Sequence, residues 1–201
     1  MIISASRRTD IPSYYSEWLV NRLKEKYVLV RNPMNIHQVS KIDLSPDVVD
    51  AIVFWTKNST PMLSYLDQIN DYTYYFQFTL SAYGPDVERN LPSKNKIIIP
   101  TFQQLSKEIG KEKVIWRYDP IFFNEQYSIE YHCKYFEVLA SKLGDYTEKC
   151  TVSFMDMYRN TERNVKLLSI VKDTYEMQVE LLQRFVEIAK EYGLYIDTCA
   201  E

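Results

Sequence analysis

The sequence predicts an α/β fold: a TIM-like (β/α) barrel, partial or incomplete, with mainly parallel strands and covering helices. Short apolar runs alternate along the chain with longer stretches whose apolar residues recur at helical spacing. Gly110, Gly144 and Gly193 each follow a helix-like stretch and precede an apolar run, as expected where a left-handed residue closes a helix. The same elements would also fit an open, doubly wound sheet.

In the first half of the chain, strands and helices alternate with one interruption. Residues 32–45 are too polar for a crossover helix, and we expect a long rim loop or a hairpin there. Residues 74–80 alternate so that Tyr75, Gln77 and Thr79 share one face of a strand. The predicted elements, in chain order, are strand 2–6, helix 13–26, strand 27–31, strand 51–56, helix 60–70 and strand 74–80.

In the second half, helix signals are clearer than strand signals. The spacing of Met177, Leu181 and Phe185 is helical. Thr101, Ser128 and Thr161 stand where helix N-caps are expected. The predicted elements are helix 101–109, strand 114–118, helix 128–143, strand 151–154, helices 161–171 and 175–192, and strand 194–198.

A single domain over residues 1–201 is expected, because no composition break, low-complexity tract or repeat divides the chain. No helix follows the last predicted strand, whereas a parallel strand normally has both faces covered and its edge protected. We therefore expect that the domain is truncated at its C-terminal end, or that another chain, for example in a homo-oligomer, covers the last strand.

Composition and charge exclude several classes of protein. The chain has 201 residues, of which 46% are hydrophobic and 25% charged, typical of a well-packed globular domain. Its apolar runs are far shorter than the roughly 20 residues that span a bilayer, and no signal pattern opens it, so a cytoplasmic protein without a membrane partner is expected. The formal net charge of −3 argues against an extensive nucleic-acid surface. Cys133, Cys150 and Cys199 are expected to be free thiols.

Cations and carboxylates follow several of the predicted strands directly. Ligands of (β/α) barrels bind at the carboxyl ends of the strands, so these residues predict a site for a small anionic ligand. The alternative is that the aspartate after the first strand caps a helix and that the cations are solvated. The strand-end residues are Arg7, Arg8, Asp10, Arg31, Lys57, Arg117 and Asp119.

Arg117 is the most informative of these residues, because Trp116 and Tyr118 should face one side of the strand and Arg117 the other. An arginine in the middle of a strand must point into a barrel or be buried against an acid. Asp119 is the first candidate partner and Asp156 the second. A purely structural ion pair is the alternative.

Gln77 and Thr79 are expected to line the interior, where they would bond to a ligand or to the buried arginine. Satisfaction of core polar groups is the modest alternative. His37 and His132 are the only histidines, which excludes a histidine-rich metal site. The chain has no Walker loop, GxGxxG, HExxH or Gly-x-Ser-x-Gly motif.

The segments SASRRTDIP, VRNP, VFWTKN, YYFQFTL, WRYDP and TCAE together resemble an uncharacterised bacterial family of unknown function. That family is grouped with radical S-adenosylmethionine proteins and is similar to spore photoproduct lyase-like members. The resemblance implies a parallel barrel with S-adenosylmethionine and a 4Fe–4S cluster as cofactors of the full-length family.

In that family the cluster cysteines lie beyond the position that matches Glu201, and the three cysteines of this chain are too widely separated for a CxxxCxxC loop. The resemblance therefore implies that this chain alone holds neither cofactor. It also implies that the matching residues form the substrate and cofactor side of the site: Arg7, Arg8, Asp10, Lys57, Arg117, Asp119 and Glu201.

The leading hypothesis is thus the barrel portion of a radical S-adenosylmethionine-type enzyme of unknown substrate. Lys57, Asp119 and Arg117 are the predicted catalytic residues. The predicted binding residues are Arg7, Arg8, Asp10, Arg31, Gln77, Thr79, Asp156 and Glu201. The alternatives are a barrel lyase or hydrolase for a small phosphorylated or carboxylated compound, with Asp119, Asp156 and Lys57 in acid–base roles, or a non-catalytic partner subunit.

Overall fold

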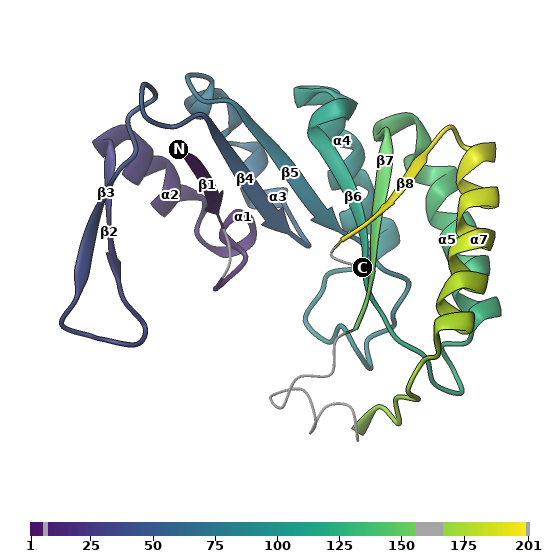
Figure 1. Ribbon diagram of the computed structural model, residues 1–201. Coiled ribbons are helices and arrows are strands. Elements are labelled where there is room, and N and C mark those ends of the chain that lie inside the picture. Colours follow the sequence, from purple (N-terminus) through teal and green to yellow (C-terminus); the bar gives the residue numbers. More distant parts are fainter. Residues whose placement is uncertain (6–7, 156–166, 200–201) are drawn as a thin grey trace. The chain divides into compact units, whose positions relative to one another are not determined.

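The computed structural model describes residues 1–5, 8–155 and 167–199 and has a mixed α/β fold (Figure 1). Its larger sheet has six strands in the order β1-β4-β5-β6-β7-β8, and the pairs β1–β4, β6–β7 and β7–β8 are parallel. The chain divides into two compact units, Met1–Gln77 (unit 1) and Phe78–Glu201 (unit 2). The six strands are β1 (Ile2–Ala5), β4 (Ala51–Thr56), β5 (Tyr74–Thr79), β6 (Val114–Ile121), β7 (Lys149–Phe154) and β8 (Tyr195–Thr198).

Unit 1 packs apolar side chains of β4 and β5 into its core. Phe54 and Phe76 are fully buried and stack with their ring centroids 4.7 Å apart. The predicted helix 13–26 is present as two helices, interrupted at Tyr15. The predicted helix 60–70 is a short helix followed by a 3₁₀ turn. The elements are α1 (Ile11–Tyr14), α2 (Ser16–Glu25), α3 (Thr60–Leu63) and the 3₁₀ turn Leu66–Ile69.

The predicted strand 27–31 exists but does not belong to the parallel sheet, so that part of the barrel prediction was wrong. β2 (Tyr27–Arg31) pairs antiparallel with β3 (Val39–Asp43) in a separate two-stranded sheet. The amide of Asn32 donates to the carbonyl of Gln38 at 2.9 Å and closes the hairpin. A connection this short can join only antiparallel strands, because a parallel pair needs a crossover of a dozen or more residues. The hairpin expected for residues 32–45 is confirmed.

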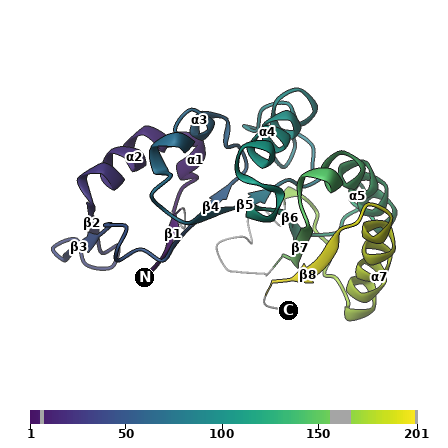
Figure 2. The same cartoon turned by 90° about the horizontal axis from the view of Figure 1, so that it is seen from above.

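Unit 2 has a parallel sheet with helices on one face. The aromatic rings of Trp116 and Phe136 stack at 4.9 Å, and Phe136 stacks on Phe185 at 4.0 Å. These contacts join β6 to two helices, and Figure 2 shows α4, α5 and α7 on one side of β6, β7 and β8. The helices are α4 (Ile99–Ile109), α5 (Ile129–Leu143) and α7 (Tyr175–Glu191), and a π-helical turn, Lys94–Ile98, precedes α4.

The other predicted strands and helices of unit 2 are confirmed, with ends shifted by a few residues. Ser128 caps α5 as predicted, since its hydroxyl oxygen accepts from the amide of Tyr131 at 3.2 Å. Thr101 lies inside α4 and is not its cap. Thr161 and most of the predicted helix 161–171 lie outside the described residues.

The strand order runs linearly from β1 to β8 in the described part of the chain, and the sheet is not closed there. The coarse prediction of parallel strands covered by helices is therefore confirmed, whereas a complete barrel is not found. The single-domain organisation stays a prediction. No helix in the described ranges combines the length and the apolar character that crossing a membrane requires.

The three punctuating glycines have two different roles. Gly110 and Gly193 have positive φ angles of 96° and 67°, as predicted for residues that close helices. Gly144 has a φ of −55°, so the prediction of a left-handed residue was wrong there. A Cβ atom at Gly144 would lie 2.8 Å from the carbonyl oxygen of Tyr192, so close backbone packing requires this glycine.

We expect Gly144→Ala to lower the free energy of unfolding by about 1–3 kcal/mol, because the new methyl group forces the Tyr192 backbone away. Gly193→Ala should cost about 1 kcal/mol through its positive φ, although nothing lies within 4 Å of the added atom. Urea titration measures both. Wild-type stability of Gly144→Ala would contradict the packing role, and Gly193→Asn, which tolerates positive φ, is the matched control.

His132 on α5 is fully buried in unit 2 and hydrogen bonded at both ring nitrogens. Its Nε2 lies 3.0 Å from the carbonyl oxygen of Phe122, which can only accept, so Nε2 carries the hydrogen. Its Nδ1 then accepts from the hydroxyl of Tyr118 at 2.9 Å. Burial lowers the pKa of His132, and the bond to Phe122 offsets this only in part.

The pKa of His132 is lower in the folded protein than in the unfolded chain, so the unfolded chain binds a proton more readily. The free energy of unfolding should therefore fall as the pH drops below the pKa of the unfolded chain, near 6.5. The slope contributed by this group should approach about 1.4 kcal/mol per pH unit. Comparing urea unfolding of wild type and His132→Gln between about pH 7.5 and 5.5 isolates it. An equal slope in both proteins would contradict the assignment.

Candidate functional site

The face of the unit 2 sheet opposite its helices carries a row of polar side chains. Arg117 of β6 is paired in register with Thr151 of β7, and Thr151 with Asp197 of β8. Directly paired residues of parallel strands point to the same face, so the three side chains lie side by side. On β6, the two neighbours of Arg117 in the chain, Trp116 and Tyr118, point to the opposite face, toward the helices. The register therefore brings together residues that are up to 80 positions apart in the sequence.

Arg117 and Asp119 form a tight, nearly buried ion pair within this row. The Nε and Nη2 atoms of Arg117 donate to Oδ2 of Asp119 at 2.9 and 2.7 Å. The side chain of Arg117 is 6% exposed and that of Asp119 18%. Thr79, at the end of β5, donates its hydroxyl to the other carboxylate oxygen at 3.2 Å. The pairing predicted from the sequence is confirmed, with Asp119 as the partner.

Cys199 and Asp197 add to the charge environment of Arg117. Burial alone would lower the pKa of Arg117, but its hydrogen bonds and charge interactions with Asp119 and Cys199 outweigh burial and raise that pKa. Burial would likewise raise the pKa of Asp197, yet hydrogen bonds from Lys149 and Thr151 and the nearby cations lower it. Nζ of Lys149 lies 2.6 Å from Oδ2 of Asp197.

We call this set the Arg117 cluster. Its two cations and two carboxylates form two ion pairs, and hydroxyl and thiol groups lie beside them. Donors and acceptors that are already oriented in this way are suited to charged or strongly polar groups. Its members are Thr79, Arg117, Asp119, Lys149, Thr151, Asp197 and Cys199.

A tyrosine fixes the backbone that follows Asp119. The hydroxyl of Tyr83 donates to the carbonyl oxygen of Pro120 at 2.8 Å and accepts from the amide of Phe122 at 3.0 Å. Burial raises the pKa of Tyr83, so this hydroxyl stays protonated and keeps both bonds. The strand end that carries Asp119 is therefore held from both sides, by Tyr83 and by Arg117.

The cysteines differ in their surroundings. Cys133 on α5 and Cys150 on β7 are buried, and burial raises the pKa of each thiol. Cys199 is exposed. No group of three or more His, Cys, Asp or Glu side chains that could hold a metal ion occurs within the described ranges. The described residues therefore do not fit an iron–sulfur cluster.

In unit 1, Asp10 joins a helix start to the end of β4. Its Oδ1 accepts from the amide of Ser13 at 2.9 Å and so caps α1. Its Oδ2 accepts from the amide of Lys57 at 2.8 Å and the hydroxyl of Thr56 at 3.0 Å. Donors at the start of α1 and at the end of β4 thus use both carboxylate oxygens of Asp10, which fits the helix-cap alternative.

Arg8 contacts the backbone of Arg31, whereas the side chain of Arg31 bonds within its own hairpin. The guanidinium nitrogens of Arg8 lie 3.4 and 3.5 Å from the carbonyl oxygen of Arg31. Nη1 of Arg31 donates to the carbonyl oxygen of Ile36 at 2.6 Å, within the hairpin loop. Because β2 belongs to the hairpin, Arg31 does not stand at the end of a parallel strand, which corrects the sequence prediction.

Of the remaining predicted site residues, two lie in the described part of the chain and three lie outside it. Gln77 is half-buried on β5 and faces away from the buried Phe76 and Phe78, as the alternation predicts. Lys57 is half-buried after β4. Their functional roles stay predictions. Arg7, Asp156 and Glu201 lie outside the described residues.

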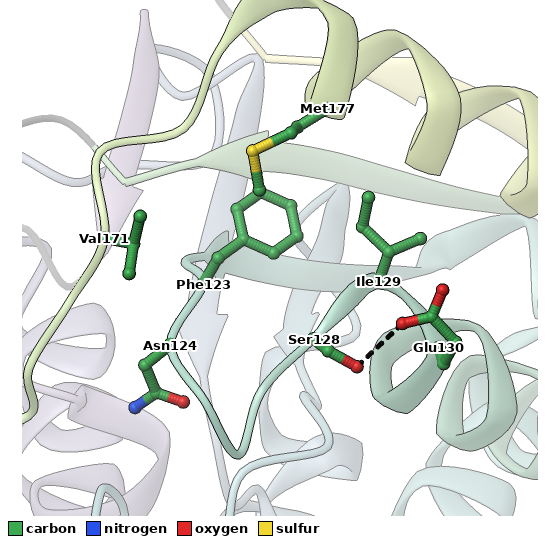
Figure 3. Close-up of a pocket in the computed structure, with 7 residues that line it drawn as sticks. All are labelled: Phe123, Asn124, Ser128, Ile129, Glu130, Val171 and Met177. Carbon is green, nitrogen blue, oxygen red and sulfur yellow. Dashed lines mark hydrogen bonds between the residues drawn. The ribbon is translucent and has the colours of Figure 1, made fainter.

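Unit 2 also has an apolar pocket of about 250 Å³ near the amino-terminal ends of α5 and α7 (Figure 3). Ser128 donates to Glu130 within the pocket lining at 3.0 Å, and Asn124 donates to the carbonyl oxygen of Leu168 at 2.8 Å. The pocket offers apolar contact without a group suited to catalysis. It is lined by Phe123, Asn124, Ser128, Ile129, Glu130, Val171 and Met177.

Sequence reasoning missed Lys149, Thr151 and Asp197. Lys149 and Thr151 alternate with the apolar Cys150 and Val152 on β7, and this weak signal was available in the sequence. Asp197 lies on a short strand whose partner is set by long-range register, and no local pattern reports that register.

Asp119→Ala should destabilise the protein by about 3 kcal/mol, because it leaves the Arg117 guanidinium buried without its carboxylate. The double variant Arg117→Met/Asp119→Leu should recover most of the loss, since no unpaired charge remains. Chemical denaturation of the three proteins tests this. Equal stability of the single and double variants would show that the pair is not buried in solution.

Three comparisons relate this chain to other proteins. No curated protein matches the sequence at the threshold applied. A crystal structure of a protein from Bacteroides thetaiotaomicron VPI-5482, assigned provisionally as an alpha-L-fucosidase, is similar with a TM-score of 0.41 and 11% identity, covering 99% of this chain and 72% of that one. The model of a domain of unknown function, DUF1848, matches residues 2–201. This chain therefore belongs to the DUF1848 family.

Proposed function

We propose that this chain forms the (β/α) portion of an enzyme of the radical S-adenosylmethionine type, whose Arg117 cluster binds a charged group of the cofactor or substrate. The observation that carries the proposal is the buried Arg117–Asp119 pair on the polar face of unit 2, opposite the helices. A barrel interior is the place where such a face would serve a ligand, so the proposal also takes the sheet as part of a barrel.

The residues of the cluster would divide the work of binding. The guanidinium of Arg117 would bind a carboxylate or phosphate oxygen of the ligand, because its planar fork matches such anions. Asp119 would act as a positioning residue, held at one oxygen by Arg117 and at the other by Thr79. Asp197 would stay ionised, since its pKa is lowered, and would bind an ammonium or hydroxyl group.

Methionine-derived ligands suit this arrangement, because they carry an ammonium and a carboxylate on one carbon, and the cluster contains both anionic and cationic groups. A 4Fe–4S cluster supplies one-electron chemistry in radical S-adenosylmethionine enzymes. The described residues do not fit such a cluster, so the proposal concerns only the binding of a cofactor or substrate group.

The lyase or hydrolase alternative receives less support. It relies on Lys57, Asp119 and Asp156, of which Asp156 lies outside the described residues. Asp119 is already bonded to Arg117 and Thr79, which suits a positioning role better than proton transfer.

Thermal unfolding with added ligand tests the binding proposal. S-adenosylmethionine should raise the melting temperature of the wild-type chain, and Arg117→Lys should weaken this binding at least tenfold by losing the planar fork. Circular dichroism checks that the variant is folded. Thr79→Val, which removes only the hydroxyl bond to Asp119, should weaken binding less.

Equal binding by wild type and Arg117→Lys would reject the cluster as the site. Stabilisation by phosphate esters but not by S-adenosylmethionine would favour the lyase or hydrolase. The radical chemistry is tested separately on a member of the DUF1848 family, reconstituted anaerobically with iron and sulfide. Absence of both a 4Fe–4S spectrum and reductive cleavage of S-adenosylmethionine would reject the radical assignment.

A further inference from the structure

The outer edge of β3 in unit 1 has unpaired backbone groups. Within the hairpin, the amide of Leu44 donates to the carbonyl oxygen of Lys26, and that of Asn32 to the carbonyl oxygen of Gln38, each at 2.9 Å. Along an antiparallel ladder, hydrogen-bonded residue pairs alternate with pairs that are not hydrogen bonded. Because Lys26–Leu44 and Asn32–Gln38 are hydrogen-bonded pairs, Val39, Lys41 and Asp43 belong to the other kind of pair. The N–H and C=O groups of Val39, Lys41 and Asp43 therefore point away from β2.

The corresponding edge of β2 is partly covered, since the Arg31 carbonyl oxygen accepts from Arg8. In the described part of the chain, no group bonds to the outer backbone edge of β3. Val39 is 47% exposed, and Lys41 and Asp43 are exposed as well. A hairpin of two strands is marginally stable by itself, and an open edge of this kind accepts a further strand.

The charges on β3 select the strand that fits. Lys41 and Asp43 lie on the same face of the hairpin, and the ammonium of Lys41 sits 4.4 Å from the ring centroid of Tyr27 on that face. Oδ1 of Asp43 accepts from the amide and hydroxyl of Ser45 at 2.8 and 2.6 Å, which fixes the carboxylate. A strand with the opposite order of charges would pair with both residues, and an antiparallel copy of β3 has that order.

We propose that β3 pairs antiparallel with β3 of a second copy of this chain, about a twofold axis at Ile42, so that two hairpins form one four-stranded sheet. Lys41 then stands opposite the partner's Asp43, and Asp43 opposite the partner's Lys41. In this register Lys41 and Asp43, whose backbone groups point away from β2, form the hydrogen-bonded pairs with the second copy. A register centred on Lys41 or on Asp43 would instead place like charges opposite each other, which destabilises a sheet.

Charge reversal tests the register. Lys41→Glu turns both cross-strand pairs into like charges, and Asp43→Lys does the same, so each variant alone should dimerise roughly tenfold or more weakly than wild type. A mixture of the two variants restores both opposite-charge pairs and should form the heterodimer. Sedimentation velocity over a concentration series measures all three. Lys113→Glu, at an exposed position of unit 2, is the control with the same change in net charge as Lys41→Glu.

Cross-linking tests the axis independently. Cα atoms of the two Ile42 residues would lie about 4.5 Å apart, within disulfide range, so Ile42→Cys should cross-link under oxidation. Wild type controls for the exposed Cys199. A wild type that stays monomeric up to about 100 μM, far above the Kd of a specific dimer, would overturn the proposal. So would Lys41→Glu that dimerises as tightly as wild type, or a mixture no tighter than either variant.

Discussion

A guanidinium in the middle of a buried strand has to be paired, and this constraint organises unit 2. Arg117 occupies a buried position of β6 and is 5% exposed. Leaving it unpaired would cost several kcal/mol, so an acid must stand within hydrogen-bond distance. Asp119 meets that need two residues later on the same face of the strand, and Thr79 and Tyr83 fix its position. The polar face of the sheet is thus built around one positive charge.

Local patterns in the sequence predicted the elements and the Arg117 pair well, because both depend on residues close in the chain. Alternation placed Arg117 opposite Trp116 and Tyr118, and Phe76 and Phe78 opposite Gln77. The spacing within β6 made Asp119 the natural partner. These inferences needed only the two-residue period of a strand.

Features that depend on distant residues were missed. The hairpin strand 27–31 has the composition of a core strand, and only its short connection to β3 reveals that it is antiparallel. Gly144 has the sequence context of a helix-closing glycine, whereas its constraint comes from the Tyr192 backbone across a turn. In each case tertiary contact decided what local chemistry left open.

The unequal burial of the three thiols has a practical consequence. Cys133 and Cys150 are enclosed and kept protonated by burial, whereas Cys199 lies at the surface and hydrogen bonds to Arg117. An alkylating reagent should therefore modify the folded chain at one position, beside the polar face of β6 and β8. A fluorophore or spin label attached there would report ligand occupancy directly, without the introduction of any cysteine by mutagenesis.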